Sequence, residues 1–178
     1  MEIVLYAPLV IYNIIIIIII IIIITLGYTC SGGCHKIPCP RGKYNPNNAS
    51  TSLAACQNCT AGTYNSLPGQ ATCQSCDVGT YNPYNGSTRC LSCNVGTYNS
   101  NTGSNSSIAC QNCAAGTYNS LPGQATCQNC TDGTYNDNTG SISSKACFPC
   151  AIGFFNPFKG QPSCQQCPGL KSISSLLS

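Results

Sequence analysis

Apolar residues are concentrated at the N-terminal end of the chain and are sparse, without a regular period, after it. Residues 3–24 form a 22-residue apolar stretch that ends in eleven consecutive isoleucines, Ile14–Ile24. The residues that interrupt it are Tyr6, Pro8, Tyr12 and Asn13. A membrane-spanning helix needs about 20 apolar residues, and the apolar core of a signal peptide needs about 7–15. The pattern therefore predicts one hydrophobic helix followed by a region without helices.

Two interpretations of residues 1–29 stay open, a cleaved signal peptide and an uncleaved membrane anchor. Thr25 and Gly27 supply small residues at the −3 and −1 positions of a cleavage site, although Glu2 is the only charge before the apolar run. Lys36 lies close enough to the stretch for the positive-inside tendency to favour the cytoplasm. The cysteine content of the rest of the chain outweighs this tendency and favours export.

The composition after residue 29 excludes an ordinary globular core. Among the 149 residues from Cys30 to Ser178, isoleucine, leucine, valine and phenylalanine number 18, which is about 12%. Chains below roughly 20% cannot build a packed interior. The same residues contain all 17 cysteines, which is typical of a disulfide scaffold. The net charge of +3 is small and dispersed, so nucleic-acid binding is not expected.

Seven Cys-x-x-Cys pairs follow one another at intervals of 17 or 20 residues. They lie at 56/59, 73/76, 90/93, 110/113, 127/130, 147/150 and 164/167. Six of the second cysteines open the sequence Cys-x-x-Gly-x-[Tyr/Phe]-Asn, and an earlier copy begins at Cys39. This self-similarity predicts an array in which each unit contacts its neighbours. We divide the chain into a leader (1–29), a cysteine-rich cap with the first loop (30–55), tandem repeats (56–167) and a tail (168–178).

Each unit is expected to be a small hairpin-like loop whose ends are tied together. In the loop from Cys59 to Cys73, Gly62 permits a tight turn and residues 63–64 (Thr-Tyr) favour a strand. Residues 67–70 (Leu-Pro-Gly-Gln) fit a type II turn. The longer units contain three additional polar residues, which we place at the tip of the turn.

The simplest disulfide connectivity closes every loop on itself. It pairs Cys39 with Cys56, Cys59 with Cys73, Cys76 with Cys90, Cys93 with Cys110, Cys113 with Cys127, Cys130 with Cys147 and Cys150 with Cys164. Closing a loop of about 15 residues contributes roughly 3 kcal/mol in the chain-entropy model. A ladder that joins equivalent cysteines of neighbouring units is an open alternative. Cys30 and Cys34 can pair with each other, which leaves Cys167 free, joined to another chain, or left over from an array that is cut short at its C-terminal end.

The recurring aromatic residue is the only large apolar side chain of most units. We expect it to cover a disulfide of its own or the adjacent unit, with a ligand-binding stripe as the alternative. These residues are Tyr44, Tyr64, Tyr81, Tyr98, Tyr118, Tyr135 and Phe155.

The motif resembles the cysteine-rich repeats of the ephrin-receptor-like type and the first half-module of tumour necrosis factor receptor ectodomains. The run from Cys39 to Asn45 (Cys-Pro-Arg-Gly-Lys-Tyr-Asn) is a particularly close match, and the resemblance extends to Cys167. It implies an elongated extracellular array with little regular secondary structure, used for ligand contact, adhesion or spacing. Receptor signalling is not expected, because no kinase or death domain accompanies the array.

Zinc is the main competing chemistry for the cysteines. Four of them have the outline of a four-thiolate site, with a central gap close to the usual 15–20 residues or so: Cys56, Cys59, Cys73 and Cys76. Seven pairs do not divide into four-cysteine sites, and the leader favours export, so disulfides are preferred. A redox enzyme is disfavoured, because a reactive Cys-x-x-Cys thiolate is stabilised at a helix N-terminus and no helical period is present after the leader.

Five Asn-x-Ser/Thr sequons are compatible with N-glycosylation on a secretory route. They are Asn48, Asn58, Asn85, Asn105 and Asn129. A cysteine stands inside the sequons of Asn58 and Asn129, which hinders modification there. His35 and the three aspartates (77, 132 and 137) form no catalytic or calcium-binding constellation, and we expect them to be solvated loop residues.

These observations predict a small disulfide-rich fold: an elongated array of short, β-hairpin-like, cystine-closed loops preceded by one hydrophobic helix. The expected function is that of a non-catalytic secreted or cell-surface protein acting in ligand binding, adhesion or as a structural spacer. No cofactor is expected, and the partner is an unidentified protein or glycan, with residues 3–24 contacting the membrane if they are retained. The alternative is an intracellular structural zinc protein.

The fate of the leader can be read from the mature N-terminus. A mature chain that begins at residue 28 or 30 has lost a cleaved signal peptide, because small residues stand at positions 25 and 27 before such a cleavage site. A chain that begins at residue 1 or 2 would instead be tethered through its apolar stretch.

Overall fold

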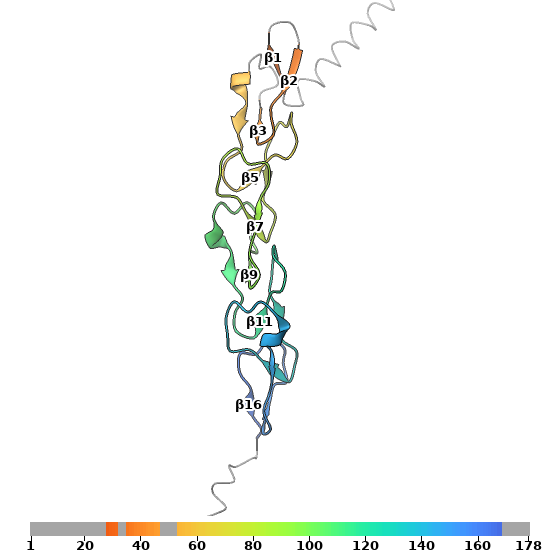
Figure 1. The fold of residues 1–178 in the computed structure, drawn as a ribbon, viewed down its shortest axis with the longest axis vertical. Helices are drawn as coiled ribbons and strands as arrows, with labels where there is room; N and C mark the ends of the chain where they lie inside the picture. Colours follow the sequence, from red (N-terminus) through yellow and green to blue (C-terminus); the bar gives the residue numbers. More distant parts are fainter. Residues whose placement is uncertain (1–27, 32–34, 47–52, 169–178) are drawn as a thin grey trace, which may run out of the picture. The chain divides into compact units, whose positions relative to one another are not determined.

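The structure, a computed structural model, describes residues 28–31, 35–46 and 53–168 (Figure 1). In this part, sixteen short strands pair two by two into antiparallel hairpins. The first hairpin joins β1 (Tyr28–Ser31) to β2 (His35–Pro38). The predicted leader helix lies outside the described residues, and within them no helix is long and apolar enough to cross a bilayer.

Each of the remaining seven hairpins pairs the two motif residues x-[Tyr/Phe] with the two residues that lie between the cysteines of the next Cys-x-x-Cys pair. The threonine and aromatic side chains favour extended backbone, and the closing disulfide holds the second strand alongside. The pairs are β3 (Lys43–Tyr44) with β4 (Gln57–Asn58), β5 (Thr63–Tyr64) with β6 (Gln74–Ser75), β7 (Thr80–Tyr81) with β8 (Leu91–Ser92), β9 (Thr97–Tyr98) with β10 (Gln111–Asn112), β11 (Thr117–Tyr118) with β12 (Gln128–Asn129), β13 (Thr134–Tyr135) with β14 (Phe148–Pro149), and β15 (Phe154–Phe155) with β16 (Gln165–Gln166).

Seven disulfides close the loops, which we number as repeats 1–7. They are Cys39–Cys56, Cys59–Cys73, Cys76–Cys90, Cys93–Cys110, Cys113–Cys127, Cys130–Cys147 and Cys150–Cys164. Each bond spans 14 or 17 residues of sequence, so every disulfide is local to one loop. The chain is therefore an array of small antiparallel hairpins that are closed individually.

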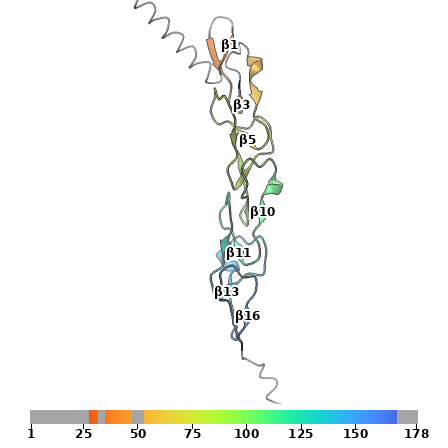
Figure 2. The ribbon, with the colours of Figure 1, turned by 180° about the vertical axis from the view of Figure 1, so that it is seen from behind.

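The chain divides into two compact units. The first contains the chain up to Cys76 together with residues 82–90, and the second contains residues 77–81 together with the chain from Leu91 onward. Within the second unit the hairpins follow one another in sequence order from β9 to β16 (Figure 1), and the view from behind shows the same order (Figure 2). Consecutive repeats are therefore neighbours in space within this unit.

The additional residues of the longer repeats lie after the turn, not at its tip as the sequence analysis predicted. Gly103 and Gly140 have φ values of 65° and 67°, close to the 71° of Gly69 in a short repeat, so the turn is the same. The added residues form one turn of 3-10 helix before the closing cysteine, and in repeats 4 and 6 a serine accepts a hydrogen bond from the amide two residues later. These turns are η1 (Leu53–Ala55), η2 (Ser107–Ala109) and η3 (Ser144–Ala146).

Among the described residues, the buried side chains are those of cysteine and asparagine. The opening cysteines of repeats 1–6 are at most 1% exposed, and the asparagine that ends each motif is at most 5% exposed. These asparagines are Asn45, Asn65, Asn82, Asn99, Asn119, Asn136 and Asn156. The motif aromatics, expected to be the main packing residues, are only partly buried, and Phe155 is exposed. Burial of a polar amide is favourable only when it is hydrogen-bonded, so the asparagines must have partners.

From Asn65 onward, each buried asparagine reaches back to the preceding repeat. Its Nδ2 donates a hydrogen bond to the carbonyl oxygen of the residue before the aromatic in the previous motif. The distances are 3.1 Å from Asn65 to Lys43, 2.7 Å from Asn82 to Thr63, 2.9 Å from Asn99 to Thr80, 3.0 Å from Asn119 to Thr97, 3.0 Å from Asn136 to Thr117 and 2.9 Å from Asn156 to Thr134. The asparagine therefore fixes one repeat on the next.

Backbone hydrogen bonds complete the contact between consecutive repeats, as repeats 5 and 6 illustrate. The Gly116 amide donates to the Asn136 carbonyl at 2.6 Å, and the Asn119 amide donates to the Ser141 carbonyl at 2.9 Å. In the opposite direction the Gly140 amide donates to the Cys113 carbonyl at 2.7 Å. Because these bonds use main-chain groups, this part of the contact depends little on side-chain identity.

Glycine is required where a repeat contacts the second repeat after it in the sequence. A Cβ at Gly116 would overlap the carbonyl oxygen of Gly160, and the motif glycines 42, 79 and 96 meet the turn glycines 86, 123 and 140 in the same way. Gly133 has a similar φ of 74°, but no heavy atom of the described residues lies within 4 Å of its Cβ position. Both glycines have a positive φ, but only Gly116 has a close neighbour. Comparing substitutions at the two positions therefore separates the effect of the steric contact from that of backbone strain.

We expect Asn136→Ala to lower the free energy of unfolding by about 2–3 kcal/mol, because it removes hydrogen bonds to Thr117 and Ser141 inside the interior. Asn138→Ala is the matched control, since that side chain is exposed and bonds only to Asp137 among the described residues. Guanidinium unfolding with the disulfides intact measures the free energy of unfolding of both variants. Equal losses in the two variants would contradict the role of the buried amide.

Gly116→Ala and Gly133→Ala should differ in stability although both place alanine at positive φ. The shared backbone strain costs about 1–2 kcal/mol, and the overlap with Gly160 should add about 1–3 kcal/mol in Gly116→Ala only. Thermal unfolding of the oxidised proteins gives the comparison. If Gly133→Ala were the more harmful change, the proposed contact between alternate repeats would be wrong.

Candidate functional site

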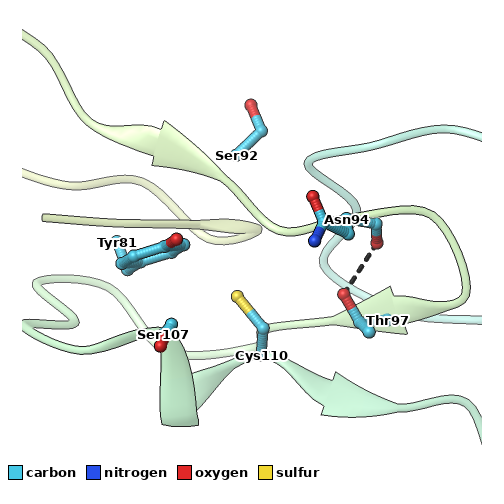
Figure 3. A pocket seen from close by; sticks show the side chains of 6 residues that line it. All are labelled: Tyr81, Ser92, Asn94, Thr97, Ser107 and Cys110. Carbon is cyan, nitrogen blue, oxygen red and sulfur yellow. Dashed lines mark hydrogen bonds between the residues drawn. The ribbon is translucent and has the colours of Figure 1, made fainter.

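A groove lies where the aromatic residue of repeat 3 faces repeat 4 (Figure 3). It is lined by Tyr81, Ser92, Asn94, Thr97, Ser107 and Cys110 and has a volume of about 160 Å³. The Tyr81 ring lies at one end and Thr97 at the other (Figure 3). Ser92 belongs to β8 and Ser107 to η2, so the polar side chains come from both edges of the groove.

The local backbone of the groove is held by short-range hydrogen bonds. Thr97 Oγ1 donates to the Asn94 carbonyl at 2.7 Å, and the Thr97 amide donates to the same oxygen at 3.1 Å. The Cys93–Cys110 disulfide ties the two sides together. The wall of the groove is therefore covalently and locally fixed, whereas its serine and asparagine side chains are exposed.

An equivalent groove occurs one repeat later. It is lined by Tyr98, Ala114, Thr117, Thr126 and Cys127 and has a volume of about 230 Å³. Tyr98, Thr117 and Cys127 occupy the motif positions of Tyr81, Thr97 and Cys110, so the two grooves arise from the same step between repeats. Ala114 stands in the place of Asn94, which makes the second groove less polar.

The groove side chains offer an aromatic surface, hydroxyl groups and a carboxamide. No acid, base or thiol lines the groove at Tyr81, and the sulfur of Cys110 is in a disulfide. Ser92, Asn94 and Ser107 make no side-chain hydrogen bond to the residues that the structure describes, so their polar atoms are available. Such a lining can bind a neutral polar molecule by stacking and hydrogen bonding.

The cysteines proposed as zinc ligands are engaged elsewhere, which overturns the zinc alternative. Cys56 is bonded to Cys39, Cys59 to Cys73, and Cys76 to Cys90. Within the described ranges no cluster of three histidine, cysteine, aspartate or glutamate residues could hold a metal ion. Disulfide sulfurs lack the thiolate charge that zinc requires. Cys167 is a free, half-buried thiol, whereas Cys34 lies outside the described residues.

The other candidate residues lie apart from the groove. Asn58, Asn85, Asn105 and Asn129 are exposed, and Asn48 lies outside the described residues. Asn85 Oδ1 accepts a hydrogen bond from the Ala61 amide at 2.9 Å. Asp77, Asp132 and Asp137 are exposed, as expected of solvated loop residues, and glycosylation stays a prediction.

Sequence reasoning identified Tyr81 but missed the polar residues that face it. Ser92, Asn94 and Ser107 belong to the next segment of chain, and no motif marks them. The regular step of the repeat was the available signal, since it places each aromatic beside the disulfide of the following loop. The structural role of the asparagine was also missed, although its presence in all seven copies of the motif marked it.

Comparison with known proteins shows that part of the array is similar to a known repeat family. A family profile described as "Tyrosine-protein kinase ephrin type A/B receptor-like" matches residues 62–110 and 105–147. These two overlapping segments span repeats 2–6 and include both grooves. No curated protein is significantly similar to the sequence.

Proposed function

Because residues 62–147 are ephrin receptor-like cysteine-rich repeats, we propose that the chain is an extracellular or cell-surface binding protein whose grooves take neutral glycans. The repeat family is a non-catalytic extracellular module, and the seven disulfides agree with that setting. The observation that carries the proposal is the uncharged groove at Tyr81, with its aromatic ring and three unengaged polar side chains.

The disulfides support a location outside the cytosol. Bonds of this kind persist in oxidising compartments and are rare where thiols are kept reduced. Fourteen cysteines of the described residues are paired, and the interior contains few other apolar groups. The chain depends on an oxidising environment for its stability, which favours secretion or display at the cell surface.

The chemistry of the groove favours a sugar over a charged ligand. A sugar ring has an apolar face that stacks on an aromatic side chain and hydroxyl groups that bond to serine and asparagine. No charged side chain lines the groove, so nothing there compensates a phosphate, carboxylate or ammonium group. A volume of about 160 Å³ is suited to one sugar ring, not to an extended peptide.

Repetition of the groove suits a polymeric ligand. A single shallow site binds weakly, since it buries little surface and leaves much of the ligand in water. Equivalent sites at Tyr81 and Tyr98 can engage two residues of one glycan, so that the second contact forms at high effective concentration. An array of similar repeats therefore offers several weak sites to one polymeric ligand.

Saturation-transfer NMR with N-acetylglucosamine, galactose and mannose as probes tests this proposal on the full oxidised chain. We expect transfer to the ring protons of at least one sugar. Asn94→Ala should weaken its binding about 3- to 10-fold, the effect of losing one hydrogen bond. The backbone carbonyl of Asn94 keeps its bonds from Thr97 in this variant.

Asn101→Ala is the matched control, because Asn101 is exposed in the same repeat but does not line the groove. It should leave sugar binding unchanged. Absence of transfer from all three sugars at millimolar concentration would exclude glycan binding and leave a spacer or protein-binding role. An equal effect of the two substitutions would place binding outside the groove.

A further inference from the structure

The shortest covalent path along the array bypasses every loop. Each disulfide joins the opening and closing cysteines of one repeat, so a pulling force crosses the repeat through the two sulfur atoms and leaves the backbone of the loop slack. From Cys39 to Cys164 the rest of this path is the pair of residues inside each Cys-x-x-Cys. These pairs are the strands β4, β6, β8, β10, β12 and β14.

This path is close to its full length in the folded chain. A strand rises about 3.2–3.4 Å per residue, whereas a fully extended backbone reaches at most about 3.6 Å. The Cα atoms of the joined cysteines are 5.5–5.8 Å apart, a separation that the disulfide fixes. One repeat therefore adds at most about 16 Å to the path. Unfolding of a loop does not raise this limit, because the loop residues are not on the path.

We propose that the array is a mechanical tether, whose disulfides limit its length even where a force breaks the contacts between repeats. The path from Cys39 to Cys164 is limited to about 100 Å, whereas the same segment with all disulfides reduced reaches about 450 Å. This function is independent of glycan binding, because it does not use the grooves. A tether of this kind holds whatever is attached to its two ends within a fixed maximum distance.

Thiols can release this limit one repeat at a time. The closing cysteines are half-buried, whereas the opening cysteines of repeats 1–6 are at most 1% exposed, so a thiolate reaches the closing sulfur first. With dithiothreitol, a bond forms to the closing sulfur, the bond between the two cysteines breaks, and its electron pair leaves on the opening sulfur. The second thiolate of the reagent then displaces the closing sulfur. Both cysteines are reduced, and the reagent is oxidised to its cyclic disulfide.

Each reduction adds a length that follows from the cysteine spacing. The joined cysteines are 14 residues apart in repeats 2, 3, 5 and 7, and 17 residues apart in repeats 1, 4 and 6. At about 3.6 Å per residue, reduction lengthens the path by about 45 Å in a short repeat and about 55 Å in a long repeat. The reduced array should therefore lengthen in two classes of step.

Optical-tweezers stretching of the exported, oxidised chain tests the proposal, with tags placed before Cys30 and after Ser178. The chain carries Cys30→Ser, Cys34→Ser and Cys167→Ser, so that only the seven described disulfides remain. Before dithiothreitol is added, the contour length between the tags should not exceed about 200 Å, of which the segments outside the array supply nearly half.

After dithiothreitol is added, we expect seven steps under constant force, four of the shorter class and three of the longer class. A longer contour length before reduction would overturn the proposal. So would steps that do not fall into these two classes, because the loops would then not be the stored length.

Cys113→Ser combined with Cys127→Ser opens repeat 5 and should lengthen the oxidised chain by about 45 Å, with the loss of one short step. Asn136→Ala is the matched control, since it removes hydrogen bonds to Thr117 and Ser141 but leaves the covalent path intact. It should change neither the contour length nor the seven steps. Equal lengthening in the two cases would contradict the proposal, because packing between repeats would then limit the length.

Discussion

The hydrogen bond from a buried asparagine to the backbone of the preceding repeat is the constraint on which the array depends. A disulfide closes one loop but does not set the position of the next loop, because each bond joins cysteines of the same repeat. The asparagine amide performs that second task, and its burial makes the bond strong in an interior that excludes water. Covalent closure and polar stacking are therefore separate contributions, made by different residues of one short motif.

Much of the fold could be predicted from cysteine spacing, since a loop of 14 or 17 residues between cysteines leaves few ways to close. The positive φ of Gly62 and of the turn glycine Gly69 also followed from local chemistry. The residues that form the interior could not be predicted. Asparagine is usually exposed, and its burial here depends on a carbonyl of another repeat, which no local pattern reveals. The predicted position of the additional residues was wrong for a related reason. The turn is held by contact with the preceding repeat, so the additional residues are accommodated after the turn.

For the same reason, the sequence identified only part of the candidate site. Tyr81 stood out as an aromatic residue in a chain with few apolar side chains, whereas its serine and asparagine neighbours resemble many other polar residues of the repeats. The groove exists because one repeat is set against the next at a fixed step, and its polarity varies with positions that differ between repeats, such as Asn94 and Ala114. A constant framework with variable lining residues allows the surface chemistry of the groove to change from repeat to repeat while the packing stays the same.

The main-chain character of the contacts between repeats has a consequence for how such a chain can change its length. Residues 56–76 and 110–130 differ only at Thr60/Ala114 and Ser75/Asn129, and all four of these residues are exposed. A block inserted by unequal recombination meets neighbours that present the same glycine, cysteine and asparagine backbone groups, so it needs no compensating substitutions at its borders. Genes for chains of this design are free to gain or lose whole blocks, and natural variants should differ in repeat number more readily than in the motif itself.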